Sequence, residues 1–199
     1  MKTVFVMGHN HFDPTWRRCF DRKAIYKGVA MASYADVEEK VVEKWLTLAK
    51  DGLNYSEGQA AVWRKYFERN PKRFKVIQDH IKAGRILVLL AGETVQDTTM
   101  SAPEGLVRNF LVAMPFYREL CGEDHPGLKL GTMEDAFGTS PNYPQILKGV
   151  GAEYALSTSY KSCPELIWVG IDGTKLRCYD KLPLKVAYDA QKHLACPEC

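Results

Sequence analysis

The 199-residue sequence lacks a long hydrophobic run and a recognisable signal peptide. No stretch approaches the roughly 20 consecutive apolar residues that a transmembrane helix requires. The first apolar run, residues 3–7, is too short for a secretory leader, and polar residues stand where a cleavage site would lie. The six cysteines are therefore expected to be reduced thiols rather than disulfides. We expect a cytoplasmic protein without a membrane partner.

The sequence also lacks a large excess of charge of either sign. Lys and Arg total 27 and Asp and Glu total 24, which gives a net charge of +3. The short basic clusters at 17–18, 22–23 and 71–73 are not interleaved with aromatic residues. They are typical of solvated faces, and we expect no nucleic-acid partner. With 46% hydrophobic residues, the composition fits one globular domain or part of a larger one.

Apolar runs alternate with amphipathic segments along the chain. The pattern predicts strands at 3–7, 53–55, 86–91, 128–133 and 154–157, and helices at about 36–48, 59–67, 71–83, 104–120 and 143–148. Ser33 or Asp36 is expected to begin the first helix, and residues 56–59 have capping-box spacing. Strands that alternate with helices indicate an α/β fold with parallel strands, either an open sheet or a barrel.

Two further segments depart from this alternation. Residues 166–179 predict a β-hairpin with a type I′ turn at Asp172-Gly173. Residues 17–32 give no assignable pattern. In the predicted helix at 104–120, which Gly122 caps, the apolar positions include Val107 and Leu111, which we expect to belong to the core stripe.

The segment Gly8–Trp16, Gly-His-Asn-His-Phe-Asp-Pro-Thr-Trp, carries the densest set of chemically active side chains. In extended backbone, alternate side chains share a side, so His9, His11 and Asp13 are expected to point the same way. Imidazole nitrogen and carboxylate oxygen are ligands that Zn²⁺ accepts in open sites. A pair of hydrogen-bonded surface histidines remains the alternative interpretation.

Three predicted strands are each followed directly by polar residues. Parallel strands bring their carboxyl ends to one edge, which is where α/β proteins place their sites. We therefore expect one rim to collect three pairs of side chains, which are His11 and Asp13, Glu93 and Asp97, and Glu134 and Asp135. Carboxylates, an imidazole and an indole suit carbohydrate chemistry. Trp16 can stack on a sugar ring, although a core position is the alternative, and Asp135 beside a cation would stay ionised and suit nucleophilic attack.

Several of these motifs, in this order, resemble the amino-terminal catalytic region of glycoside hydrolase family 38, the α-mannosidases. Residues 9–16 are similar to the family's His-x-His-x-Asp-x-x-Trp signature, and residues 92–108 to its Gly-Glu-x-x-x-Arg region. Residues 134–138 with Pro144-Gln145 resemble its Asp-x-Phe-Gly and Pro-Gln segments, and residues 168–174 resemble its Trp-x-Gly-x-Asp-Gly-Ser hairpin. The resemblance extends from about residue 3 to residue 179.

The resemblance implies a retaining, zinc-assisted hydrolysis of terminal α-mannosides. His11, Asp13 and Asp135 would bind one Zn²⁺ ion, Asp135 would also be the nucleophile, and Trp16 would line the sugar pocket. His9 would not be a ligand but would have a supporting role. The implied fold is the first part of a seven-stranded (β/α) barrel over 1–179, followed by a tail over 180–199. The substrate would be a mannose-containing oligosaccharide or glycoside.

The sequence departs from the family pattern before the nucleophile. Thr132 and Glu134 stand where the family usually has Trp and Pro, so Glu134 is a rival for Asp135. The family's acid/base carboxylate and fourth zinc ligand match no residue here. We therefore expect an incomplete chain that is inactive alone and, because part of a barrel exposes a sheet edge, forms a homo-oligomer.

Two other functions remain open from the sequence. A metal-dependent carbohydrate deacetylase would use a similar ligand cluster with a metal-bound water, and Asp135 would then be a ligand or base. A non-catalytic carbohydrate-binding protein derived from the family is the third interpretation. The terminal Cys196-x-x-Cys199 is either half of a structural zinc site or two idle thiols.

Overall fold

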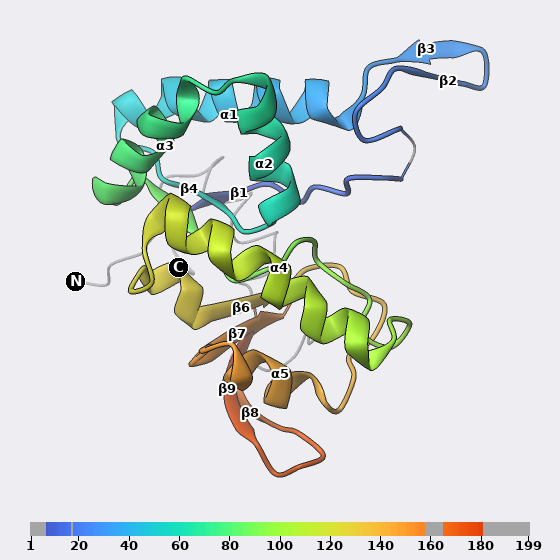
Figure 1. Ribbon diagram of the computed structural model, residues 1–199, viewed down its shortest axis with the longest axis vertical. Helices are drawn as coiled ribbons and strands as arrows, with labels where there is room; N and C mark the ends of the chain where they lie inside the picture. Colours follow the sequence, from blue (N-terminus) through green and yellow to red (C-terminus); the bar gives the residue numbers. More distant parts are fainter. Residues whose placement is uncertain (1–6, 17, 158–164, 181–199) are drawn as a thin grey trace, which may run out of the picture. The chain divides into compact units, whose positions relative to one another are not determined.

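The computed structural model describes residues 7–16, 18–157 and 165–180 of the chain (Figure 1). It divides into two compact units, and one of the boundaries between them, after Val107, falls within a long helix. Unit 1 comprises Met1–Thr94 and Arg108–Leu128, and unit 2 comprises Val95–Val107 and Lys129–Cys199. The predicted strand at 3–7 lies largely outside the described residues. The described part of that region places a strand at Gly8–His9, where the sequence predicted the strand to end.

A parallel three-stranded sheet forms the centre of unit 1. Its order is β1-β4-β5, and its strands are Gly8–His9, Tyr55–Glu57 and Ile86–Val88. The helices between these strands are α1 (Tyr34–Leu48), α2 (Ala60–Arg69) and α3 (Arg73–Lys82), with a 3₁₀ turn η1 at Ala49–Asp51. Helices that connect parallel strands in this way account for the predicted α/β alternation.

Helix α1 begins at a reciprocal cap, as the sequence predicted for Ser33. The Ser33 hydroxyl accepts a hydrogen bond from the Asp36 N–H at 3.1 Å, and the Ser33 N–H donates to the Asp36 carboxylate at 2.9 Å. The prediction of a capping box at residues 56–59, ahead of α2, is wrong. Glu57 lies in β4, and its carboxylate accepts the N–H groups of the two residues that follow it, so α2 begins without a side-chain cap.

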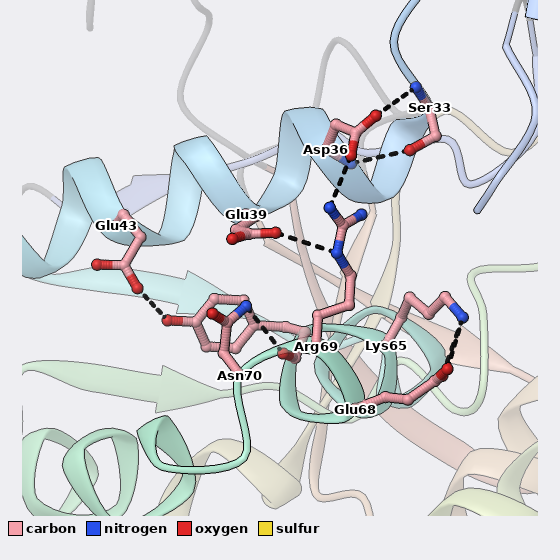
Figure 2. Close-up of polar contacts among 9 residues, drawn as sticks. Ser33, Asp36, Glu39, Glu43, Lys65, Glu68, Arg69 and Asn70 are labelled. Carbon is pink, nitrogen blue, oxygen red and sulfur yellow. Dashed lines mark hydrogen bonds and ion pairs between the residues drawn. The ribbon is translucent and has the colours of Figure 1, made fainter. Parts of the chain in front are cut away.

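Charged side chains join α1 to α2 on the face shown in Figure 2. The Arg69 guanidinium lies 2.7 Å from the Asp36 carboxylate and 3.1 Å from that of Glu39. Hydrogen bonds from Arg69 and Ser33 lower the pKa of Asp36 to about 2. One turn further along α1, the Tyr66 hydroxyl donates to Glu43 at 2.6 Å. These pairs are partly exposed and fix the register of the two helices more than they add stability.

Aromatic side chains from α2 fill the core of unit 1. Trp63 is fully buried, stacks on Phe67 with a ring separation of 5.8 Å and meets Tyr55 edge-on. The long helix α4 (Pro103–Cys121) adds Tyr117, whose hydroxyl lies 2.5 Å from the Gly58 carbonyl and 2.7 Å from the Gly92 carbonyl. That hydroxyl joins the segments that follow β4 and β5.

The unassigned stretch 17–32 contains a hairpin, β2 (Ala24–Tyr26) and β3 (Val29–Met31). Consecutive positive φ angles of 49° at Lys27 and 78° at Gly28 close it, as a type I′ turn requires. Ile25 is 78% exposed. The hairpin escaped prediction because it has no buried face, and hence no apolar alternation.

Unit 2 is built on a four-stranded sheet of order β6-β7-β9-β8. The strands are β6 (Leu130–Met133), β7 (Tyr154–Ser157), β8 (Glu165–Val169) and β9 (Lys175–Asp180), preceded by the 3₁₀ turn η2 (Pro126–Lys129) and accompanied by helix α5 (Tyr143–Gly149). β6, β7 and β9 are parallel, and β8 pairs antiparallel with β9. The predicted hairpin is confirmed, but its turn is not type I′. Only Gly173 of the Asp172-Gly173 pair has a positive φ, and the Gly170 N–H bonds to the Thr174 carbonyl across a longer loop.

The α/β class with parallel strands is confirmed. The described strands form separate sheets in the two units, so the barrel stays a prediction. Val107 and Leu111 of α4 are 41% and 60% exposed, and their predicted place in the core is wrong. No helix in the described ranges is both long enough and apolar enough for a membrane span.

Candidate active site

The segment after β1 carries two of the three predicted ligands, His11 and Asp13. His11 Nε2 is 3.4 Å from Asp13 Oδ1, and each side chain is 44% exposed. Asn10 and Phe12 alternate with them and point into the protein. The Asn10 amide donates to Glu38 Oε2 at 2.7 Å, and buried Phe12 packs edge-on against Tyr34. Of the three side chains predicted to share one side, His11 and Asp13 therefore lie side by side.

His9 has a different position. Its Nδ1 atom lies 3.1 Å from both the carbonyl oxygen and the hydroxyl of Ser56 on the adjacent strand β4. With the proton assigned to Nδ1, His9 donates to the Ser56 carbonyl. This hydrogen bond links β1 to β4.

Two buried carboxyl groups lie beneath this segment, and sequence reasoning did not identify them. Glu38 and Glu57 are 3% and 1% exposed. Burial and the charge of Glu57 raise the pKa of Glu38 to about 8, so Glu38 holds its proton at neutral pH. The Tyr55 hydroxyl lies 3.5 Å from Glu38. For Glu38, the sequence did contain a signal: it precedes the apolar Val42 by four residues, which places both on the same face of α1.

The Gly92-Glu93 segment after β5 is fixed by Asn109 of α4. The Asn109 amide donates to the Thr94 carbonyl at 2.9 Å and accepts the Thr94 N–H at 3.0 Å. Gly92 has φ of 82°, and a Cβ atom there would lie 2.1 Å from Asn109 Nδ2, so only glycine fits. Glu93 lies 3.4 Å from Arg64 Nε.

The proposed nucleophile Asp135 belongs to unit 2, in the loop that follows β6. Its side chain is exposed and its φ is +50°, a conformation that residues other than glycine rarely adopt. Its rival Glu134 is partly buried, and Phe137 is 77% exposed. Nearby, a cavity of about 250 Å³ is lined by hydroxyl, amide and apolar groups without a charged side chain, from Thr98, Thr99, Ser101, Pro103, Leu106, Ser140, Pro141, Asn142 and Ile146.

The structure thus places the predicted site residues in two groups. His11, Asp13 and the 70%-exposed Trp16 belong to unit 1, whereas Asp135 belongs to unit 2. Among the described side chains, no three His, Cys, Asp or Glu residues form a group that could hold a metal ion. One imidazole nitrogen and one carboxylate oxygen side by side fit Zn²⁺ as half of a ligand set. Cys196 and Cys199 lie outside the described residues.

Comparison with known proteins decides the family. The profile of the glycosyl hydrolases family 38 N-terminal domain matches residues 1–192. The chain belongs to glycosyl hydrolase family 38. This family 38 chain is 23% identical over 183 residues to alpha-mannosidase G of Dictyostelium discoideum, and 23% identical over 188 residues to alpha-mannosidase 2C1 of Mus musculus. Each alignment covers 87% of this chain and 16% of the relative, so the chain spans about a sixth of these proteins' length.

A solved structure supports the fold of this family 38 chain. The crystal structure of an alpha-mannosidase from Enterococcus faecalis V583 matches it with a TM-score of 0.70 and 19% identity. The match covers 87% of this chain and 19% of that chain. At this identity the likeness concerns the fold alone.

Proposed function

We propose that this protein is the amino-terminal part of an α-mannosidase, which hydrolyses terminal α-mannosides with retention of configuration. The family match over residues 1–192 carries the proposal. The adjacent His11 and Asp13 side chains at the end of β1 support it, because they stand at the ligand positions of the family signature. In this proposal His11, Asp13 and Asp135 hold one Zn²⁺ ion.

Asp135 would act as the nucleophile. Its carboxylate would attack the anomeric carbon while the bond from that carbon to the leaving oxygen breaks, which gives a covalent glycosyl ester that water then hydrolyses. The bound zinc would supply Lewis-acid stabilisation and a template for the substrate's hydroxyl groups. The exposed Trp16 indole would stack on the sugar ring.

By the family resemblance, the general acid that would protonate the leaving oxygen is matched to no residue of this chain. The 199 residues alone are therefore expected to turn over little substrate. Ligand binding is a better test than turnover, because binding requires the pocket and the metal but not the acid.

The test is calorimetric titration of the zinc-supplied chain with a mannose-configured iminosugar and with its glucose-configured epimer. We expect the mannose-configured compound to bind about tenfold more tightly or better, since the metal and Asp135 read the arrangement of hydroxyl groups. Asp135→Ala should abolish that binding, and Glu134→Ala should leave it unchanged. Equal binding of the two epimers, or tight binding by the Asp135→Ala variant, would refute the proposal.

A further inference from the structure

The loop that carries Asp135 is held by a short segment from elsewhere in unit 2. Asp97 Oδ1 accepts a hydrogen bond from the Phe137 N–H at 2.8 Å. Phe137 follows Asp135 by two residues, and Asp97 lies forty residues before Phe137 in the sequence. A carboxylate that accepts a backbone N–H makes a charge-assisted hydrogen bond, which is stronger than a neutral one.

Two threonines next to Asp97 hold the same loop. The Thr98 hydroxyl accepts the Ser140 N–H at 2.7 Å and lies 3.5 Å from the Gly138 carbonyl. The Thr99 hydroxyl lies 3.5 Å from the Phe137 carbonyl. Residues 97–99 therefore contact backbone groups of Phe137, Gly138 and Ser140.

Asp97 is itself anchored by a turn. Its carbonyl oxygen accepts the N–H groups of Met100 at 3.0 Å and Ser101 at 3.1 Å, and it also accepts a hydrogen bond from the Ser101 hydroxyl at 3.2 Å. A side chain on a fixed backbone can impose a position on its partner. The hydrogen bonds therefore tie the turn at 97–101 to the loop after β6.

The loop needs such a constraint because its backbone is strained. Asp135 has φ of +50°, which costs free energy for a residue with a Cβ atom and persists only where neighbouring groups enforce it. At Gly138, φ is +115° and a Cβ atom would lie 3.2 Å from Thr99 Cγ2. Residues 97–99 thus lie against the loop at the point where only glycine fits.

We propose that Asp97 is a positioning residue, which holds the Phe137 N–H and thereby fixes the left-handed backbone that presents the Asp135 carboxyl group at the end of β6. This role rests on the proposed function only because that function makes Asp135 the nucleophile and a zinc ligand. The placement of the loop itself depends on the contacts of Asp97, Thr98 and Thr99.

The test uses amide hydrogen exchange and backbone chemical shifts of the labelled 199-residue chain, measured by NMR. In Asp97→Ala we expect exchange at the Phe137 amide to be at least about tenfold faster and the shifts of Asp135 to leave their left-handed values. Asp97→Asn keeps an acceptor oxygen. It should retain the Asp135 shifts while the Phe137 amide proton moves upfield, because the bond loses its charge.

Asp172→Ala is the matched control. The Asp172 carboxylate accepts the Thr174 N–H at 3.1 Å in the turn between β8 and β9, so this variant removes the same kind of bond from another loop. It should speed exchange at Thr174 and leave Phe137 unchanged. If the exchange rate and the chemical shift of the Phe137 amide were unchanged in both Asp97 variants, the positioning role would be overturned.

Asp135→Asn separates this proposal from the proposed function. It should abolish binding of the mannose-configured iminosugar and leave the Phe137 amide protected, whereas Asp97→Ala should weaken binding and deprotect that amide. Undiminished binding by Asp135→Asn, with the Asp97 effects present, would refute the mannosidase function and keep the positioning role. Loss of binding in Asp135→Asn, with the Phe137 amide still protected in Asp97→Ala, would refute the positioning role alone.

Discussion

At the scale of single residues, the side chains that hold the candidate site in place are as informative as the proposed ligands. His11 and Asp13 are close in sequence, so the alternation of extended backbone was enough to predict that they share a side. Their supports come from distant segments. Glu38 meets Asn10 across 28 positions, and Asp97 meets Phe137 across 40. Contacts over such separations leave no spacing pattern in the sequence, so neither support was predicted.

Glu38 gives a prediction about pH. Its folded-state pKa is raised from 4.5 to about 8, so the folded protein keeps a proton that the unfolded chain releases above pH 4.5. The stabilisation is fully present below pH 4.5 and is lost as the pH rises through about 8. Between pH 5 and 8 we expect the free energy of unfolding to fall by about 2 to 4 kcal/mol from this group.

Glu38→Gln should remove that dependence, because glutamine carries no titrating proton and can still accept from Asn10. Urea unfolding at several pH values measures it. The control is Glu68→Gln, which changes an exposed glutamate paired only with Lys65 on its own helix among the described contacts. Parallel pH profiles for the wild type and Glu38→Gln would show that Glu38 is ionised in the folded protein.

At the scale of elements, prediction succeeded wherever a helix or strand has one buried side. Helices α1, α2, α4 and α5 lie within a few residues of their predicted positions, because an apolar stripe at helical spacing marks each of them. It failed for the exposed hairpin of β2 and β3. It also failed at the start of α2, where the Glu57 side chain bonds to local backbone groups and the predicted cap is part of a strand.

Strand β5 is held by another hydrogen bond between residues far apart in the sequence. The Val88 N–H donates to Nε2 of the buried His125 at 3.0 Å, an interaction that requires a neutral imidazole. Burial lowers the pKa of His125 below its usual 6.5. Its contribution to stability is therefore complete above pH 6.5 and is lost as the pH falls toward the lower folded-state pKa.

His125→Gln should reduce the acid sensitivity of unit 1, because the glutamine oxygen can accept the Val88 N–H without titrating. We expect the melting temperature of the wild type to fall more steeply than that of the variant between pH 7 and 5. His80→Gln on α3 is the control for loss of a histidine, since this side chain is only partly buried. A variant as acid-sensitive as the wild type would contradict the assignment.

At the scale of the whole molecule, the family is established and the chain spans 16% of the length of its curated relatives. The sequence motifs predicted that family from residues in unit 1 and unit 2 together. In the proposal, His11, Asp13 and Asp135 are the zinc ligands; the first two belong to unit 1 and Asp135 belongs to unit 2. The account therefore depends on whether these three residues bind one ion.

The most direct measurement is the zinc content of the purified chain by elemental analysis, for the wild type and for His11→Ala, Asp13→Ala and Asp135→Ala. His80→Ala is the matched control for loss of an imidazole. We expect close to one zinc per wild-type and His80→Ala chain, and a loss of most of it in the other three, because a Zn²⁺ site with one ligand removed binds far more weakly. Zinc retained in all three variants would place the metal elsewhere and contradict the proposed site.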